Sequence, residues 1–516
     1  MPAVDHRFVQ TNDVQFDCCL PPRENLFMSI QSLFENGNLP NIVLIITDQE
    51  RKLQHWPSSF RRHLPAMTRL MKAGLTFENA FTGASMCSPS RATFLTSNYP
   101  AVTGVTVTGS PEPHNALPLE TVFPNLATVL AKAGYQTIVW KGKWHLGGST
   151  GPDAYGFSGW DQRDAGNYLF SPPSPPPKNA PVSFSSLGGG TPDNDGRYLT
   201  DILSFLSSVT QPFCLVASFV NPHDVFMGYG FPSEYGYPST NFPFHPIPLP
   251  KNASQNPDTM PRAQAAQTWN PKLAVTQQNY LNFYAYLQTL VDGQILDILN
   301  QLNQSSLLDS TLIIRFADHG EMGISHGLVE KFYNAYEETI HIPLIFSNPV
   351  VWPAPAATNA MASLLDLVPT LASLLGVSTY FPGLKGQDLT PILENPSASV
   401  QESVHFTYDD ETTTDGPSVV RTIRNAAFTY SVYFVEHGSD ADWEHYDLNA
   451  DPLQNNNVAG TEPYAVAQTQ LDQQLQQFMA AMGTAPSFTW PPTSTAHSRG
   501  GPPAPIVSPP LPPMGA

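Results

Sequence analysis

The chain is poor in positive charge. Its 516 residues include 24 lysines and arginines against 43 aspartates and glutamates, and the formal net charge is −19. Non-specific binding to nucleic acid needs a basic surface, so this balance argues against a nucleic-acid partner. It is compatible with a protein that gathers its few basic residues in a pocket for an anionic substrate.

Cysteines and long apolar runs are also scarce. Four cysteines (Cys18, Cys19, Cys87 and Cys214) cannot staple a chain of this length, and their spacing matches no zinc motif. No stretch approaches the roughly 18 apolar residues of a membrane span. The first 40 residues lack the basic start and apolar run of a secretory signal. We therefore expect a cytoplasmic protein without a membrane partner.

Short apolar runs that alternate with helical patterns are what the sequence does contain. The apolar, β-branched runs lie at 41–47, 136–140, 213–220, 311–317 and 342–346, and helical patterns lie at 125–134, 280–302 and 363–376. Continuous apolar strands are typical of a parallel sheet covered on both faces. Strands that alternate with helices indicate an α/β fold. We predict a large, mostly parallel sheet flanked by helices.

The pattern changes along the chain and predicts four regions. They are an N-terminal extension (1–39), a main α/β domain (40–398), a smaller C-terminal α+β subdomain (399–484) and a proline-rich disordered tail (485–516). Two long segments, about 147–193 and 224–272, lack periodicity and are expected to be loops, which often serve as lids. The aromatic stretch 226–245 is expected either to line a pocket or to form a surface loop.

Charged and imidazole residues follow four of the predicted strands. They are Asp48 and Gln49, Lys143 and His145, His223, and Asp318 and His319. One aspartate after a strand is usually a cap, but four such ends at one sheet edge indicate a ligand site. Two carboxylates, an amide and an imidazole favour Ca²⁺, while Mn²⁺ and, less so, Zn²⁺ stay open. Lys141, Lys143 and His145 suit the other half of an anion site, where they would contact the oxygens of a tetrahedral oxyanion.

The segment "SMCSPSRATFLTS", residues 85–97, places a thiol among these candidates. It is expected to begin a helix, with Ser88 or Ser90 as the cap and Pro89 in the first turn. A thiol at a helix N-terminus has a lowered pKa and faces anions. The residues alone leave three interpretations of Cys87: a reactive thiolate, a metal-bound thiolate or an inert cysteine in a turn.

This segment resembles the sulfatase signature C-x-P-x-R, in which the cysteine is oxidised after translation to Cα-formylglycine. The segments "PNIVLIITDQE", "GYQTIVWKGKWHLGG", "YGFSGWD", "DHGEMG" and "HYDLNADP" match the same family in the same order, over about residues 40–460. The resemblance implies an alkaline-phosphatase-like fold and hydrolysis of a small-molecule sulfate ester. It also implies maturation by a formylglycine-generating enzyme.

The resemblance further implies roles for individual residues. Cys87, as formylglycine, would be both nucleophile and metal ligand, and the other metal ligands would be Asp48, Gln49, Asp318 and His319. Arg91 would hold the formylglycine. The substrate-contacting and acid–base positions would be Lys143, His145, His223 and Lys331. In this scheme, His223 with Lys331 protonates the leaving oxygen, and His145 removes a proton so that sulfate is eliminated.

The metal-ligand positions depart from the commonest family pattern. Most arylsulfatases have Asp-Asp and Asp-Asn where this chain has Asp48-Gln49 and Asp318-His319. The combination resembles the branch of choline sulfatases and phosphonate monoester hydrolases. Two alternatives to a sulfatase therefore stay open: a phosphonate monoester or phosphodiester hydrolase with the same site, and a catalytically inactive anion-binding homologue.

Overall fold

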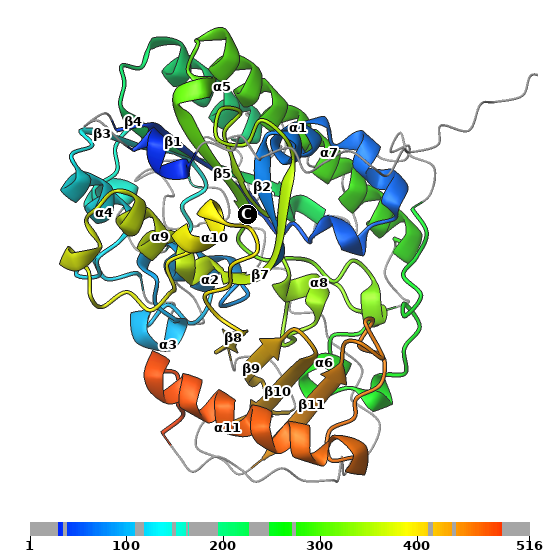
Figure 1. The fold of residues 1–516 in the computed structure, drawn as a ribbon. Coiled ribbons are helices and arrows are strands. Elements are labelled where there is room, and N and C mark those ends of the chain that lie inside the picture. Colours follow the sequence, from blue (N-terminus) through cyan, green and yellow to red (C-terminus); the bar gives the residue numbers. More distant parts are fainter. Residues whose placement is uncertain are drawn as a thin grey trace, which may run out of the picture.

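The computed structural model describes residues 29–34, 39–108, 118–146, 151–160, 164, 194–225, 247–270, 275–410, 416–435 and 440–487. Most of the predicted N-terminal extension and proline-rich tail lies outside these ranges, as does the aromatic stretch 226–245. Within them the chain forms a seven-stranded and a four-stranded sheet (Figure 1). The domain boundaries given above stay predictions.

The larger sheet has the strand order β3-β4-β1-β5-β6-β2-β7. Its strands are β1 (Asn41–Asp48), β2 (Gly74–Phe81), β3 (Thr137–Gly142), β4 (Phe213–Pro222), β5 (Thr311–Ala317), β6 (Leu344–Ser347) and β7 (Ala356–Ser363). Only β6 runs antiparallel to its neighbours, β5 and β2. The predicted mostly parallel sheet is therefore confirmed.

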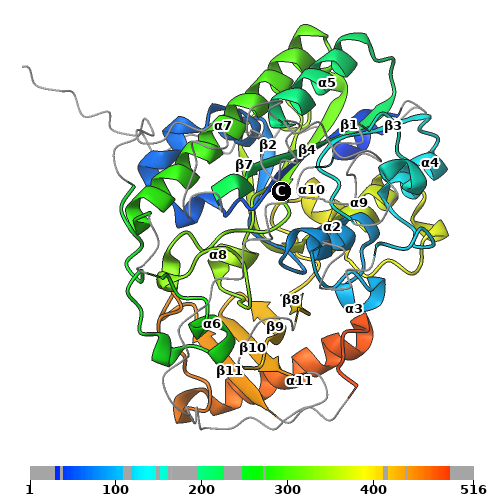
Figure 2. The same cartoon turned by 180° about the vertical axis from the view of Figure 1, so that it is seen from behind.

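Helices cover both faces of this sheet (Figures 1 and 2). Ile42, Leu44 and Ile46 of β1 belong to a core with α2 (Cys87–Thr96), α4 (Leu126–Ala133) and α9 (Leu367–Leu374). Val43 and Ile45 belong to a second core with α1 (Pro65–Lys72), α5 (Asn194–Ser208) and α7 (Gln277–Gln304). Alternate side chains of one strand thus fill two cores, which explains the continuous apolar run.

Four shorter helices connect the larger elements: α3 (Pro100–Thr103), α6 (Arg262–Ala265), α8 (Glu337–Ile340) and α10 (Thr390–Glu394). The described part of the expected loop 224–272 holds α6 and packs on the second sheet. There Arg262 pairs with Asp442 at 3.1 Å, and Gln264 donates to Glu444 at 3.0 Å. No helix in the ranges above combines the length and apolar composition needed to cross a membrane.

The C-terminal region forms an antiparallel sheet of order β11-β10-β9-β8 with one long helix. Its elements are β8 (Ser403–Tyr408), β9 (Val419–Asn425), β10 (Phe428–Phe434), β11 (Ala441–Asp447) and α11 (Ala465–Met482). Leu471, Leu475 and Met479 of α11 pack on one face, where Figure 1 shows the helix crossing the strands. The other face contacts the main domain. A smaller C-terminal α+β unit is therefore confirmed.

Candidate active site

Four strand ends and one helix start meet at the carboxyl edge of the seven-stranded sheet. Asp48 ends β1, Asp318 directly follows β5, Lys143 directly follows β3 and His223 follows β4. Cys87 begins α2 after β2, a short turn further along the chain. The fold therefore places at one edge side chains that are as far apart in the sequence as Asp48 and Asp318.

Three of these side chains form a compact cluster with His319, the residue after Asp318. Asp48, Cys87, Asp318 and His319 are buried, and one potential ligand atom of each lies within 4.8 Å of the others. Cys87 Sγ lies 3.5 Å from Asp48 Oδ1, and His319 Nε2 lies 3.8 Å from Asp318 Oδ1. Among the described residues, His319 Nε2 is buried without a hydrogen-bond partner. This donor set fits a divalent cation.

Two basic side chains balance the carboxylates. Arg91 Nη2 lies 3.0 Å from Asp48 Oδ2 and 3.1 Å from Asp318 Oδ2, and Lys143 Nζ lies 2.7 Å from Asp48 Oδ2. Burial opposes ionisation of Asp48, but Lys143, His223 and Arg91 hold its pKa well below the usual range. Burial and the Asp48 charge raise the pKa of Asp318 to about 7. A cation would displace the remaining proton from Asp318 as it binds.

The start of α2 differs from its prediction in one respect. Pro89 lies in the first turn as expected, but the predicted serine caps are wrong, because the N-cap residue is Met86 and no side chain caps the helix. Ser88 and Ser90 instead donate hydrogen bonds to carbonyl oxygens of other segments. Their hydroxyls are therefore already used by tertiary contacts.

These hydroxyls tie Cys87 to two neighbouring strand ends. Ser88 Oγ donates to the carbonyl of His145 and Ser90 Oγ to the carbonyl of Asp318, each at 2.5 Å.

The expected lowering of the thiol pKa is also wrong: burial raises the pKa of Cys87, and the Asp48 carboxylate adds to this effect. The unmodified thiol is thus held neutral, which disfavours a reactive thiolate.

Gln49 and Lys331 lie beside this cluster and contact each other. Gln49 Oε1 lies 2.5 Å from Lys331 Nζ, and the Gln49 backbone N–H donates to Asp318 Oδ1 at 3.1 Å. Gln49 Nε2 donates to Glu321 and Glu330, two buried residues that the sequence analysis missed. The available signal was their position: Glu321 lies within the DHGE motif, and Glu330 precedes Lys331. Metal coordination by Gln49 stays a prediction.

Two further aspartates hold the histidine-bearing segments. The Asp164 carboxylate accepts hydrogen bonds from the backbone N–H groups of His145 and its predecessor, each at 2.8 Å. The Asp195 carboxylate, in the first turn of α5, accepts from Asn221 at 3.0 Å and from the preceding N–H at 2.8 Å, just before His223. A carboxylate that binds backbone groups leaves no motif, so the sequence analysis missed both.

The site backbone is conformationally unusual. Gln49, Met86, His145 and Glu330 have φ values of 66°, 74°, 56° and 65°. Such left-handed conformations cost about 1–3 kcal/mol each and cluster at functional sites. Gly142, at the end of β3, is required because a Cβ atom there would lie 1.9 Å from a carbonyl oxygen of β4. The turn into Lys143 and His145 depends on that close approach.

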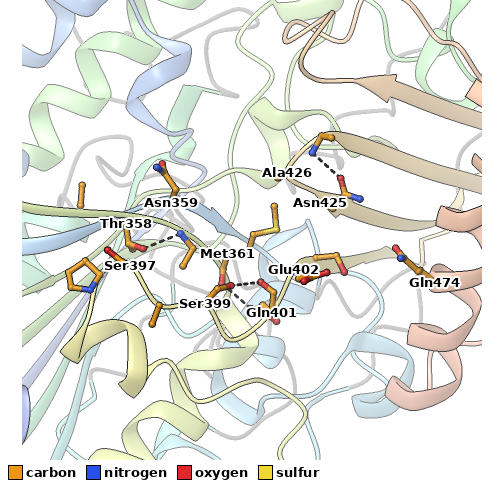
Figure 3. A pocket seen from close by; sticks show the side chains of 16 residues that line it. Thr358, Asn359, Met361, Ser397, Ser399, Gln401, Glu402, Asn425, Ala426 and Gln474 are labelled. Atoms are coloured by element: carbon orange, nitrogen blue, oxygen red, sulfur yellow. Dashed lines mark hydrogen bonds between the residues drawn. The ribbon is translucent and has the colours of Figure 1, made fainter. Parts of the chain in front are cut away.

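A separate cleft of about 790 Å³ lies between β7 and the C-terminal sheet (Figure 3). Polar residues line it, among them Thr358, Ser399, Gln401 and Asn425. None of the site residues described above lines this cleft. Some of its polar groups already have partners within the protein: Gln401 Nε2, for example, donates to the Met361 carbonyl at 3.2 Å. We therefore assign the chemistry to the strand-end cluster.

The chain combines a mostly parallel α/β sheet with a buried cluster of carboxylates and basic side chains at its strand ends, which is the alkaline-phosphatase-like architecture that the sulfatase resemblance predicts. The sulfatase family model matches residues 40–377, and the model for the C-terminal region of N-sulphoglucosamine sulphohydrolase matches residues 324–481. The chain therefore belongs to the sulfatase family, whose members are sulfuric ester hydrolases.

Individual relatives agree with this assignment. The ulvan-active sulfatase of Formosa agariphila is 26% identical over 456 residues, which are 86% of this chain and 82% of that protein. The choline-sulfatase of Rhizobium meliloti is 28% identical over 457 residues, with 81% and 82% covered. The phosphonate monoester hydrolase structure of Agrobacterium radiobacter has a TM-score of 0.62 at 20% identity, covers 86% and 96% of the two chains, and shows the shared fold. The resemblance to this branch is confirmed.

Proposed function

We propose that the protein hydrolyses a small-molecule sulfate ester to an alcohol and inorganic sulfate at the cluster around Cys87. The observation that carries this proposal is the buried convergence of Asp48, Cys87, Asp318 and His319 within 4.8 Å in a chain of the sulfatase family. Family membership supplies the reaction class, and the cluster supplies the place where it occurs.

We infer that a formylglycine-generating enzyme converts Cys87 to formylglycine, since Pro89 and Arg91 complete the signature around it. When present, the hydrated aldehyde supplies two hydroxyls on one carbon, one to attack sulfur and one to release the sulfate. Asp48, Asp318, His319 and residue 87, with Gln49, would hold a divalent cation, Ca²⁺ rather than Mn²⁺ from the oxygen-rich set. Such a cation supplies charge stabilisation and lowers the pKa of a nearby hydroxyl.

The basic side chains prepare the site for an anionic ester. Lys143 and Lys331 are buried, and fixed positive charges of this kind stabilise the oxygens of a sulfuryl group without reorganisation. Arg91 holds Asp48 and Asp318 in register at 3.0 and 3.1 Å. Their arrangement is therefore set before the substrate arrives.

The histidines carry the proton transfers in this proposal. Burial and Lys143 lower the pKa of His223 well below its usual range in the free protein. A bound sulfate ester acts in the opposite direction because its negative charge favours imidazolium. We therefore expect His223 to gain its proton with the substrate and to donate it to the leaving oxygen, while His145 accepts the proton whose loss expels sulfate.

The mass of the peptide that contains residues 85–91 tests the modification. Formylglycine is about 18 Da lighter than cysteine, so the active protein should carry that deficit at position 87. Cys87→Ala should retain the fold and lose hydrolysis of an aryl sulfate. A fully active preparation with an unmodified thiol would overturn the proposal.

A second candidate is hydrolysis of a phosphonate monoester or phosphodiester at the same site. Two observations favour this second candidate. They are the residues Gln49 and His319 at the metal positions and the structural similarity to a phosphonate monoester hydrolase. Rates on an aryl sulfate and an aryl phosphonate, measured with one preparation, separate the two. We expect the sulfate to be hydrolysed faster, and the reverse order would make the second candidate the better description.

A further inference from the structure

The side-chain amide of Gln49 is enclosed by two buried glutamates. Gln49 Nε2 lies 2.5 Å from Glu321 Oε2 and 2.9 Å from Glu330 Oε2, and Gln49 Oε1 lies 2.5 Å from Lys331 Nζ. An amide group has two N–H donors on one side and an acceptor oxygen on the other. With both donors directed at carboxylates and the oxygen at an ammonium, only one of its two flipped orientations is satisfied.

The two glutamates are fixed from their other sides. Glu321 Oε1 accepts hydrogen bonds from the Tyr280 hydroxyl at 2.9 Å, the Gly323 N–H at 3.0 Å and the Glu330 N–H at 2.8 Å. Glu330 Oε2 accepts from Lys331 Nζ at 3.1 Å. These contacts hold the glutamate oxygens in place around position 49. The oxygens would therefore keep their positions if another side chain replaced Gln49.

A carboxylate at position 49 would be badly placed. Its oxygens would lie where Nε2 now lies, within hydrogen-bond distance of Glu321 and Glu330. Both glutamates are buried, with 0% and 4% of their surface exposed, so solvent would not screen the repulsion. Like charges at such a separation in a buried site are strongly unfavourable.

We propose that Glu321 and Glu330 are positioning residues that select an amide at position 49 and fix its oxygen on the side of Lys331. This inference rests on the proposed function, because its consequence concerns the cation that Asp48, Asp318 and His319 would hold. An amide is neutral, so the glutamate pair keeps a third carboxylate away from Asp48 and Asp318, the two carboxylates of the proposed cation site.

Metal titration and thermal unfolding test the proposal without turnover. The dissociation constants of Ca²⁺ and Mn²⁺ are measured by calorimetry, and unfolding is followed with and without metal. Glu330→Gln should weaken metal binding about 10- to 100-fold, as changes in residues that orient ligands generally do. Gln49→Glu should lower the melting temperature of the metal-free protein. The double variant should regain stability, because the new amide at 330 donates to the new carboxylate at 49.

Gln264→Glu is a matched control, since Gln264 Nε2 donates to the buried Glu444 at 3.0 Å in the C-terminal sheet. It should lower the melting temperature and leave metal affinity unchanged. If Glu330→Gln does not fold, the comparison of Gln49→Glu with the double variant decides. A parent protein that binds neither metal would refute the proposed cation and leave that comparison valid. A double variant no more stable than Gln49→Glu, or parental metal affinity in Glu330→Gln, would overturn the proposal.

Discussion

Arg91 joins more parts of the site than its single charge suggests. Its guanidinium contacts Asp48 and Asp318, and it also donates to the Lys143 carbonyl and the Ser218 hydroxyl, both at 2.9 Å. The side chain is fully buried. Because a planar guanidinium presents five donors in a fixed fork, one residue can hold two carboxylates, the end of β3 and the neighbouring strand β4 together.

Replacement of Arg91 should therefore be costly in the metal-free protein. Arg91→Met leaves Asp48 and Asp318 with one cationic partner fewer, and breaking a buried pair of this kind costs about 3–5 kcal/mol of unfolding free energy. Urea unfolding measures the loss, and excess Ca²⁺ should restore part of it. Arg61→Met, at an exposed position, is the control and should change stability little. Equal stability of the two variants would contradict this view of Arg91.

The residues that the sequence analysis found and missed differ in their partners. Cys87, Asp48 and Asp318 lie directly after strands or in a motif, so local spacing identified them. Glu321 and Asp164 act on an amide and on backbone N–H groups that only the fold brings to them. A sequence states which groups are present, but it does not state which distant backbone groups need an acceptor.

At the scale of elements, two carboxylates determine how β3 and β4 continue into the site. The two carboxylate oxygens of Asp164 accept hydrogen bonds from two successive backbone N–H groups just after β3, and those of Asp195 accept from two successive N–H groups in β4. The geometry fixes the direction in which the chain leaves the strand, including the φ of 56° at His145. Placement of His145 and His223 thus depends on residues far from them in the sequence.

Asp164→Asn should reduce kcat more than it reduces stability. The asparagine keeps one oxygen that accepts a hydrogen bond, but its NH₂ group faces the other backbone N–H, and two donors cannot bond. The segment that holds His145 should therefore shift. A misplacement of about 1 Å can cost on the order of 100-fold in rate. Asp292→Asn is the matched control, because Asp292 accepts from Ala66 and Met67 N–H groups at 2.8 and 2.9 Å at the start of α1.

Steady-state kinetics and thermal unfolding of both variants decide the matter. We expect similar losses of melting temperature, with a fall in kcat and a shifted pH profile for Asp164→Asn alone. Parallel changes in both variants would mean that Asp164 is only structural.

The elements that the sequence did not predict have an identifiable physical reason. The apolar runs indicated β1, β3, β4, β5 and β6, and the helical patterns indicated α4, α7 and α9. β7 escaped because its sequence, AATNAMAS, is small and polar and forms the sheet edge. β2 escaped because GLTFENAF interrupts its apolar residues with charge. Edge and mixed strands are defined by their neighbours, which a single sequence does not display.

At the scale of the whole molecule, buried histidines make stability depend on pH. Burial lowers the pKa of His326 and of His405 to about 3 and that of His445 to about 4. The unfolded chain takes up protons at these residues near pH 6.5, whereas the folded protein does not. The stability that these three histidines contribute is therefore unchanged above that value and is lost progressively as the pH falls from about 6.5 towards these lower values.

His405→Gln should make this acid sensitivity smaller. Each such histidine contributes a slope of about 1.4 kcal/mol per pH unit between the two pKa values, so the variant's slope should fall by that amount. Denaturant unfolding from pH 7 to pH 5 gives the slope directly, whatever the variant's stability at neutral pH. His63→Gln, at a partly exposed position, should reduce the slope less than His405→Gln does, although burial and Arg62 lower the pKa of His63 as well. An unchanged slope for His405→Gln would contradict the assignment.

The burial of Cys87 has a consequence for the life history of each molecule. Cys87 is 1% exposed and Arg91 is 0% exposed, and hydrogen bonds from Ser88 and Ser90 attach the start of their helix, α2, to the segments at His145 and Asp318. An enzyme that modifies this side chain has to bind the residues on both sides of it. The folded protein buries these residues, so the enzyme cannot reach them. We expect the conversion to take place on the nascent polypeptide, in a race with folding. If Cys87 is modified as proposed, molecules that fold first would stay unmodified and inactive, and adding the converting enzyme afterwards would not restore their activity.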